Sequence, residues 1–464
     1  MTVPQPDDAG DPRAATVCLD VGSCWTKAVL VQPDGSPSGY AEHPTTPDVL
    51  AGVDAAVAAA AAAGHSGAAS PEVLACSSAG GALRLAVVGA ERLAATEAAH
   101  RVCRTAGARV VGVYSGALES SDVRELAGQR PGVVLLLGGA DGEDPGIVLH
   151  NAGRLARTRG GYPVLLAVDD AARNDALSLL RAGGRAVTTC PNVIPRTGEI
   201  VPGPARNAVT RLYERHVLGR SGEDGRFTSL ARTRTPLAVS GGAAALARVT
   251  GTGVLVVDIG SATTDVHQAV DPAFLASAPE PLVTVEGDLG LRDGAHGLIV
   301  EAQADGVVDP VEADLLTPAV SALAGAGASV PATRGEAAED RRLAAVAAVL
   351  ALRRHLRATG HLADPDGDDG LPGSQQRGAL GLRGAAALGD IGLVVLTGGV
   401  FRQRDPAGLA AVAATVESDP VLAPVLTGAD VRIDGEVVLA PAGLLAASGR
   451  ERAARALLTE QLLE

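Results

Sequence analysis

The sequence predicts an α/β protein with two related lobes and a ligand cleft between them. Apolar runs of strand length alternate with helix-length segments along most of the 464 residues, as in α/β domains. The motif Asp-x-Gly-Ser occurs twice, at 20–23 and at 258–261, each time between two apolar runs. Each copy is followed by a later apolar run that ends in Gly-Gly, at Gly138 and at Gly398. This repeated order of motifs indicates two lobes of one design.

Composition excludes several classes of protein. The chain is 47% apolar but only 2% aromatic, so we expect a core of Ala, Val and Leu. A net charge of −14 without a basic stripe argues against a nucleic-acid surface. The longest apolar run, 55–63, is about half of a membrane span, and the acidic start does not resemble a secretory signal. The five cysteines lack metal-ligand spacing and support neither disulfides nor a zinc site. We therefore expect a cytoplasmic protein without membrane or nucleic-acid partners.

Length and motifs divide the chain into a disordered leader (1–14), lobe I (15–250) and lobe II (251–464). In lobe I, β-branched runs bounded by turn residues predict strands, and Ala- and Leu-rich stretches between them predict helices. Strands are expected as a hairpin in 15–31, as a further strand after the turn 35–39, and at 72–76, 83–88, 110–114, 133–137, 163–168 and 186–189. Helices are expected at 48–63, 91–107, 170–181 and 206–218, followed by a polar connection at 221–234.

Lobe II is expected to begin directly with the hairpin 253–267. The same reasoning predicts strands at 281–285 and 391–396, a turn at 286–290, helices at 311–323, 336–357 and 407–416, and a terminal strand and helix. The segment 363–378 is acidic and rich in Gly and Pro, which predicts a mobile loop.

The two hairpins predict phosphate-binding turns. A glycine and small hydroxyl residues let backbone N–H groups approach an anion, and a carboxylate at the strand end can hold hydrated Mg²⁺ against phosphates. Asp20 and Asp258 are therefore candidates to hold the metal through water and to orient an attacking water. The candidate phosphate contacts are Gly22, Ser23, Cys24, Trp25 and Thr26, and Gly260, Ser261, Ala262, Thr263 and Thr264. The alternative is that each Asp caps its own turn and the Thr hydroxyls pack within the strands.

Lys27 is the only lysine among the 39 basic residues. The chain otherwise uses Arg for positive charge, so this lysine suggests a need for a compact ammonium group. Such a group would neutralise charge that develops in phosphoryl transfer, which makes Lys27 a catalytic candidate with Asp20 and Asp258. The alternatives are chance survival and a side chain that points outward from the returning strand.

Two Gly-Gly pairs are candidate nucleoside contacts, because bare backbone at a strand end can approach a base or a ribose. They are Gly138 with Gly139, and Gly398 with Gly399. One pair alone is a weak signal in a chain with 58 glycines.

Acidic residues in Gly-rich turns are candidates for a general base or a further Mg²⁺ contact. They are Asp141, Glu143, Glu286 and Asp288. The alternative is that they are solvated turn carboxylates, and for the nearby His267 and His296 we expect structural roles.

Motifs in order along nearly the whole chain resemble the actin, hexokinase and heat-shock-chaperone superfamily of ATPases. Within it, the chain resembles the MutL family associated with glutamate mutase, which is unrelated to the mismatch-repair protein of the same name. The motifs are DVGSCWTK (20–27), SSAGGALRLAVVG (77–89), LLLGGADGED (135–144), VVDIGSATTDVH (256–267), TVEGDLGLR (284–292), LTGGVF (396–401) and APAGLLAA (440–447). Two positions depart from the usual pattern: Cys24 replaces a Thr-like residue, and Ser261 replaces a second glycine.

The resemblance implies a two-lobed actin-like ATPase fold of duplicated ribonuclease H-like lobes, with ATP and Mg²⁺ in the central cleft. It also implies an accessory protein of a cobalamin-dependent mutase, by analogy a reactivating or assembly chaperone whose partners are the mutase subunits. A small-molecule kinase of the same superfamily and a nucleotide-binding scaffold without turnover remain alternatives. The sequence names no base beside a substrate pocket, which favours the ATPase over the kinase.

Overall fold

The computed structural model describes most of the chain. The described residues are 15–92 without 47, 65–70 and 79–82; 94, 95, 98 and 102; 108–201 without 159 and 198; 204, 205, 208, 209 and 212; 230–362 without 271–281, 293 and 324–327; and 391–464 without 403 and 404. Within these ranges no helix is both long and apolar enough to cross a membrane.

Two five-stranded sheets share one topology. The first has the order β3-β2-β1-β4-β10, with β1 (Thr16–Val21), β2 (Trp25–Val31), β3 (Pro37–Pro44), β4 (Glu72–Ser77) and β10 (Ala231–Arg234). The second has the order β13-β12-β11-β14-β15, with β11 (Gly253–Ile259), β12 (Thr264–Ala269), β13 (Leu282–Glu286), β14 (Ile391–Thr397) and β15 (Asp430–Asp434). In each sheet the first strand pairs antiparallel with the second and parallel with the fourth. The expected duplication of ribonuclease H-like sheets in an actin-like fold is therefore confirmed.

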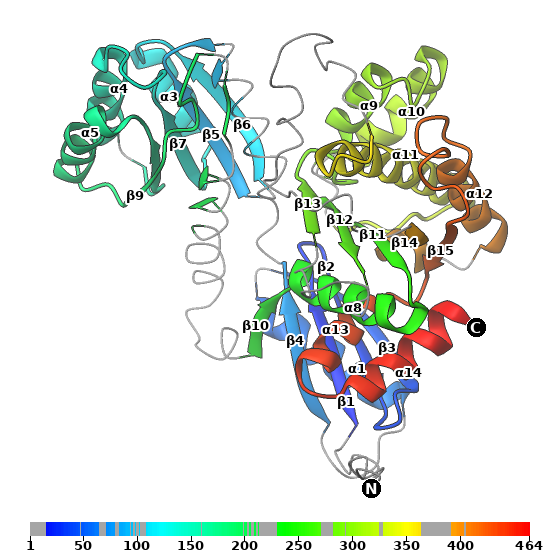
Figure 1. Cartoon of the computed structure of the whole chain (residues 1–464). Coiled ribbons are helices and arrows are strands. Elements are labelled where there is room, and N and C mark those ends of the chain that lie inside the picture. Colours follow the sequence, from blue (N-terminus) through cyan, green and yellow to red (C-terminus); the bar gives the residue numbers. More distant parts are fainter. Residues whose placement is uncertain are drawn as a thin grey trace, which may run out of the picture.

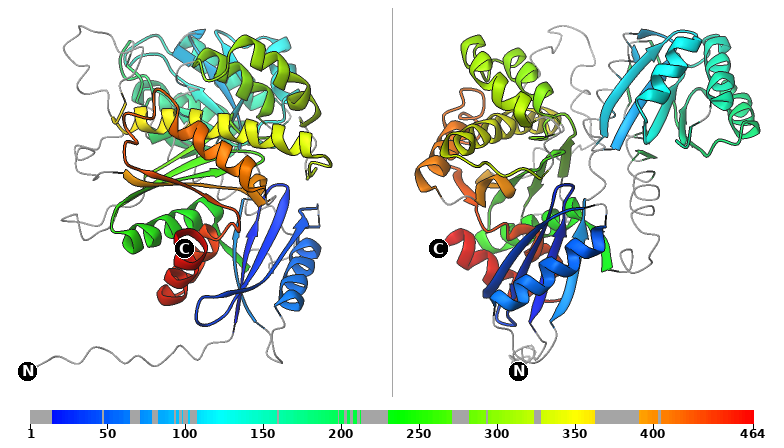
Figure 2. Two further views of the ribbon diagram at one scale, coloured as in Figure 1. Left: turned by 90° about the vertical axis from the view of Figure 1, so that its right-hand side faces the viewer. Right: turned by 180° about the vertical axis from the view of Figure 1, so that it is seen from behind.

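A third sheet is inserted between β4 and β10. Its order is β6-β5-β7-β8-β9, and all its pairs are parallel: β5 (Leu83–Gly89), β6 (Ala108–Ser115), β7 (Val133–Leu137), β8 (Val164–Ala167) and β9 (Val187–Cys190). Helices α3 (Ser120–Gly128), α4 (Gly146–Arg157) and α5 (Asp170–Ala182) accompany it. Its continuous apolar strands fit a sheet that is buried on both faces. It lies to one side of the duplicated sheets (Figures 1 and 2).

Three helices lie between the two duplicated sheets and join their cores (Figure 1). They are α8 (Thr235–Thr250), α13 (Leu439–Ala447) and α14 (Glu451–Leu458). Their shared cluster takes Cys18 and Val29 from the first sheet and Val256 from the second. Helices α8 and α13 approach closely, because a Cβ at Gly242 or Gly443 would collide with the facing helix backbone. The expected boundary at residue 250 thus falls at the end of α8, a helix that serves both sheets.

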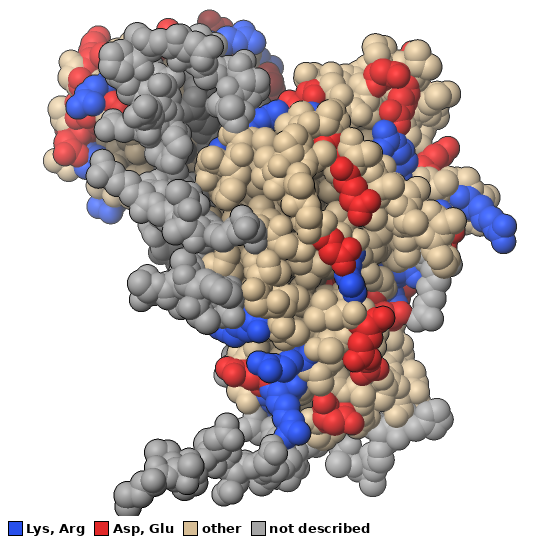
Figure 3. Space-filling model, turned by 45° about the vertical axis from the view of Figure 1, so that its right-hand side comes forward, with Lys and Arg blue, Asp and Glu red and all other residues tan. Residues whose placement is uncertain are grey.

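Outer helices cover the remaining faces. The first sheet carries α1 (Val49–Ala63), which Asp48 caps through a hydrogen bond from the Ala51 N–H. The second sheet is covered by the long helix α11 (Arg334–Ala358) with α9 (Ala295–Ala304), α10 (Pro310–Leu323) and α12 (Pro406–Glu417), and a 3₁₀ turn, η5 (Gly399–Arg402), follows β14. On the face shown in Figure 3, Lys and Arg side chains are interspersed with Asp and Glu.

Most expected strands and helices within the described residues are present, often to within two residues. Helices α3, α4, α8 and α9 were not predicted, two helices (α13 and α14) follow β15 where one was expected, and the expected polar connection ends in a strand, β10. Helix α8 escapes prediction because it is buried between two sheets and carries small apolar residues on all sides, without the amphipathic stripe of a surface helix. The leader 1–14, the loop 363–378 and most of the expected helices 91–107 and 206–218 lie outside the described residues.

Candidate functional site

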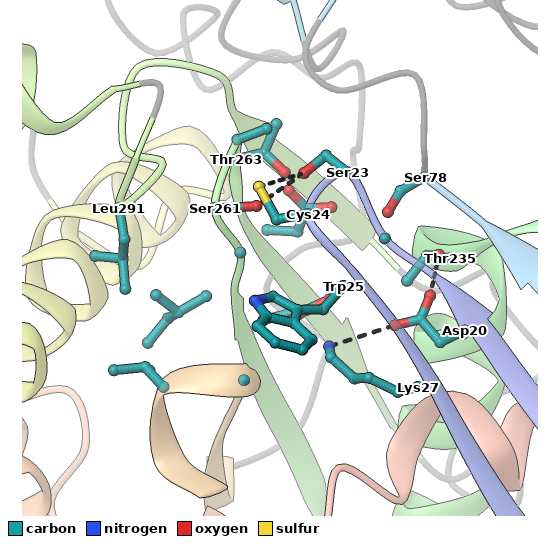
Figure 4. Close-up of a pocket in the computed structure, with 18 of the residues that line it drawn as sticks. Asp20, Ser23, Cys24, Trp25, Lys27, Ser78, Thr235, Ser261, Thr263 and Leu291 are labelled. Atoms are coloured by element: carbon teal, nitrogen blue, oxygen red, sulfur yellow. Dashed lines mark hydrogen bonds and ion pairs between the residues drawn. The ribbon is translucent and has the colours of Figure 1, made fainter. Parts of the chain in front are cut away.

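A cavity of about 460 Å³ lies between the two duplicated sheets, and both hairpin turns line it. Figure 4 shows the β1–β2 and β11–β12 turns meeting across it, with Trp25 and Lys27 side by side on β2. The Oγ atoms of Ser23 and Ser261, 238 residues apart in sequence, are hydrogen-bonded at 2.8 Å. The two copies of the motif therefore form one site.

Both turns have the same backbone geometry. The N–H of Gly22 donates to the carbonyl of Trp25, and the N–H of Gly260 donates to the carbonyl of Thr263, each at 2.9 Å. A Cβ added at Gly22 or Gly260 would lie 2.8 or 2.9 Å from the same carbonyl oxygen. A side chain at either position would therefore push against backbone, and this explains the glycine in each motif.

The turns offer donors for an anion. The backbone N–H groups of Ser23 and Ser261 have no hydrogen-bond acceptor among the residues that the structure describes. The second turn is also held from outside the hairpin: the N–H groups of Leu291 and Arg292 donate to the carbonyls of Gly260 and Ser261. Two anchored turns with available donors fit the phosphate groups of a nucleotide.

Both carboxylate oxygens of Asp20, on β1 of the first hairpin, have partners. Its Oδ1 accepts a 2.6 Å hydrogen bond from the Thr235 hydroxyl, and its Oδ2 lies 3.5 Å from Lys27 Nζ. Asp20 and Lys27 are cross-strand partners on β1 and β2, which places both side chains on the cavity face. Lys27 therefore points into the cavity, and the outward alternative does not apply.

Asp258 and Asp265 hold the matching positions in the second hairpin. Burial raises the pKa of Asp258 to about 6; the Lys27 ammonium lowers it, and the carboxylates of Asp20 and Asp434 raise it. Burial likewise raises the pKa of Asp265 well above its ordinary value, with a further contribution from Asp258. The second hairpin thus contributes a carboxyl that titrates near neutral pH.

One flank of the cavity is formed by the turn after β14 and by β3. Gly399, Val400 and Arg402 line it from lobe II, and Glu42 lines it from lobe I. The Arg402 guanidinium forms an ion pair with Glu42 and lies 3.4 Å from the centre of the Tyr40 ring. This contact bridges the two lobes beside the Gly-Gly turn.

Most of the predicted site residues gather here. The cavity is lined by Asp20, Gly22, Ser23, Cys24, Trp25, Lys27, Asp258, Gly260, Ser261, Ala262, Thr263 and Gly399. Thr26 and Thr264 are buried beneath it; their hydroxyls bond to the Thr45 hydroxyl and the Leu289 carbonyl, as in the strand-packing alternative. Gly398, with φ of 140°, packs against Ile259 backbone behind the turn.

Gly138 and Gly139 do not line the cavity, because they follow β7 in the third sheet. Gly138 packs against Val168, and Asn192 donates to the Gly139 carbonyl. By topology the counterpart of β14 in the first sheet is β4, not β7. Gly80 and Gly81, which follow β4 in sequence, lie outside the described residues.

None of the four candidate acidic turn residues lines the cavity either. Glu286 and Asp288 form ion pairs with Arg354. Asp141 accepts a hydrogen bond from Asn192 in the inserted domain, where Glu143 also lies. The structure thus leaves Asp20, Asp258 and Asp265 as the carboxylates at the turns.

Sequence reasoning missed several lining residues. Thr235, Asp265, Glu42, Arg402 and the buried ion pair Arg292–Asp340 also line the cavity. One signal was available: both motifs carry a charged residue seven positions after their first Asp, Lys27 and Asp265. Pro236 near the start of α8 was a second, because proline favours the first helical turn.

No group of three or more His, Cys, Asp and Glu side chains in the described residues is arranged to hold a metal ion. Mg²⁺ commonly binds through one or two carboxylates together with waters and substrate phosphates. Asp20 and Asp258 at the turns fit that pattern. The described cysteines are free, and of these Cys18, Cys76 and Cys190 are buried.

The family profile and a curated relative give the same family. The sequence profile of the MutL protein family matches residues 16–462. Protein MutL of Clostridium tetanomorphum is 32% identical over 306 residues, which cover 61% of this chain and 65% of that protein, so the match spans less than two thirds of the curated relative.

Solved structures align with low similarity. An ATP-dependent caprolactamase from Pseudomonas jessenii is 14% identical, with a TM-score of 0.37 over 95% of this chain and 70% of that one. A ROK family glucokinase from Streptomyces griseus is 12% identical, with a TM-score of 0.33 over 93% and 98%. Component A of the (R)-2-hydroxyglutaryl-CoA dehydratase of Acidaminococcus fermentans is 12% identical, with a TM-score of 0.29 over 95% and 99%. Since the family profile spans nearly the whole sequence, the chain belongs to the MutL family.

Proposed function

We propose that the cavity binds Mg-ATP, and that the protein hydrolyses it as an accessory protein of a cobalamin-dependent mutase of the glutamate mutase type. In this role it would reactivate the mutase or assist its assembly. The observation that carries the nucleotide assignment is the pair of matched turns, joined at Ser23 and Ser261, with the only lysine of the chain beside them.

Each residue group has a role that its position supports. The N–H groups of the two turns would bind the phosphates, and Gly399 with Val400 would contact the nucleoside at the neighbouring flank. Asp20 and Asp258 would hold Mg²⁺ through water. Bound Mg-ATP supplies the terminal phosphoryl group and the charge that the site must stabilise.

Lys27 and Asp258 are the proposed catalytic pair. The Lys27 ammonium is held by Asp20 and would stabilise negative charge at the phosphates. Asp258, with a pKa of about 6, is mostly ionised at neutral pH and would orient the attacking water.

The mutase partnership is supported by family membership and by the architecture. Two lobes that meet at a nucleotide site can close and open with the nucleotide state, and such a motion can act on a bound protein. The Arg402–Glu42 bridge is a contact that would respond to this motion.

The test is phosphate release from Mg-ATP by the purified protein, alone and with a cobalamin-dependent mutase that carries inactivated cofactor. Nucleotide binding is followed by the fluorescence of Trp25, the only tryptophan. We expect release that the mutase stimulates, lost in Asp258→Ala and retained in the control Asp430→Ala, whose side chain is exposed on β15. Release stimulated by a small acid or sugar instead would indicate a kinase, and binding without release would indicate a scaffold.

A further inference from the structure

We infer that Thr235 is a positioning residue that fixes the carboxylate of Asp20, and that through helix α8 it ties Asp20 to lobe II. The inference rests on the proposed function for its consequence in catalysis. It rests on hydrogen bonds and burial for its structural part.

Thr235 makes the shortest polar contact of Asp20. Its hydroxyl donates to Asp20 Oδ1 at 2.6 Å, and the Cys76 thiol approaches the same oxygen at 3.6 Å. Thr235 and Cys76 are buried, and Asp20 is 8% exposed. Figure 4 shows Thr235 on the side of Asp20 opposite Lys27. Because the Thr235 hydroxyl holds Oδ1, the other carboxylate oxygen of Asp20, Oδ2, faces Lys27 and the cavity.

Helix α8 links this contact within lobe I to lobe II. Thr235 is the first residue of the helix, directly after β10 of the first sheet, and the helix leads into β11 of the second sheet. Ser240, further along the same helix, is hydrogen-bonded to His267 of β12 at 2.8 Å. A rigid helix that binds Asp20 at one point and β12 at another makes the orientation of Asp20 depend on the position of lobe II.

The chemistry at residue 235 decides the outcome of substitution. Valine matches the shape of threonine but cannot donate, so Thr235→Val would leave Oδ1 without its hydroxyl donor. Hydrogen bonds to charged groups are the strong ones, and losing one costs about tenfold or more in an equilibrium. Serine keeps the hydroxyl and loses only a methyl group. Thr250→Val is the matched control, because Thr250 ends the same helix and its hydroxyl bonds only to α8 carbonyls.

Two measurements test the inference. The first is the Mg²⁺ concentration for half-maximal ATP turnover, which should rise about tenfold in Thr235→Val and stay near wild type in Thr235→Ser and Thr250→Val. The second needs no nucleotide: in protein labelled with ¹³C at lysine Cε, Lys27 gives the single lysine signal. That signal should shift in Thr235→Val and not in Thr235→Ser or Thr250→Val. Thermal unfolding is measured for all three variants to check that they are folded.

An unchanged Lys27 signal in folded Thr235→Val would overturn the inference. Equal effects of valine and serine would also overturn it, because the methyl group rather than the hydroxyl would then matter. If the wild type neither binds nor hydrolyses Mg-ATP, the proposed function fails, and the Lys27 signal still decides whether Thr235 positions Asp20.

Discussion

Asp265 occupies in the second hairpin the position that Lys27 occupies in the first. Lys27 pairs across the strands with Asp20, and Asp265 pairs with Asp258. The duplicated site is thus electrically asymmetric: one half carries an ion pair, and the other carries two carboxyls. Because of this asymmetry, the charge of the second hairpin depends on pH. The positive charge beside its carboxyls comes from Lys27 of the first hairpin.

Asp258 should make nucleotide binding and turnover depend on pH. Burial raises its pKa from the ordinary 3.8 to about 6, so the carboxylate needed for Mg²⁺ is protonated as pH falls. We expect kcat/KM for Mg-ATP to decrease below about pH 6. Asp258→Asn should lose most of the activity, and the activity that remains should not show this decrease. A flat profile from pH 5 to 8 in a stable protein would contradict the assignment.

The same shift has the opposite sign for stability. Because the folded pKa is raised, the unfolded chain loses its proton first as pH rises. The contribution of Asp258 to the stability of the folded state is therefore fully present below pH 3.8. It is lost as the pH rises through about 6. At pH 8, Asp258→Asn should raise the free energy of unfolding of the unliganded protein by on the order of 1 kcal/mol. The effect is this small because Asp258 is partly exposed to the cavity. Near pH 4 the substitution should change the free energy of unfolding little. Urea unfolding at the two pH values measures the difference.

Lys27 should be replaceable by neither Met nor Arg. Its ammonium is the compact cation at the turns, and losing one electrostatic contact to a transition state costs about 10²-fold or more in kcat. Arg spreads its charge over a larger planar fork, so Lys27→Arg would not place a compact positive charge where the Lys27 ammonium lies, 3.5 Å from Asp20. Lys27→Met should also move the acid limb of the pH profile upward, because Lys27 lowers the pKa of Asp258. An unmoved limb would show that the two groups are not coupled.

Gly260 should not tolerate a methyl group. An added Cβ would lie 2.9 Å from the Thr263 carbonyl oxygen, so Gly260→Ala must distort the second turn. We expect Mg-ATP affinity, read from Trp25 fluorescence, to fall by at least about tenfold, because the turn's N–H donors are displaced. Gly153→Ala is the control: it lies within α4 with open space around its Cβ, and should increase stability by about 0.5–1 kcal/mol.

Arg354 should be essential for the stability of lobe II. It forms ion pairs with Glu286, Asp288 and Glu301, and Glu286 is 2% exposed. Arg354→Met would remove the buried cation that these three carboxylates share, at a cost of about 3–5 kcal/mol in unfolding free energy. Arg196→Met, which removes an exposed pair with Glu199, should change stability by less than about 1 kcal/mol. Similar effects of the two variants in denaturant titrations would contradict the assigned burial.

The local parts of the site could be predicted from sequence and the long-range parts could not. The Asp-x-Gly-Ser turns are fixed by neighbouring residues, so their glycines and both aspartates could be named. The pairing of β14 with β11 and of β7 with β5 depends on sheet topology, and a Gly-Gly pair looks alike at the end of either strand. Thr235 reaches Asp20 across 215 residues, a contact that no local pattern encodes.

The core shared by the two lobes has a consequence for biosynthesis. Cys18 and Val29, near the start of the chain, pack in one cluster with Leu445 and Leu457, near its end. During synthesis the inner face of the first sheet would therefore stay uncovered until α13 and α14 had been made. Such contacts of high sequence separation slow folding and leave apolar surface uncovered. The β1–β2 hairpin is thus made long before the helices that complete its packing.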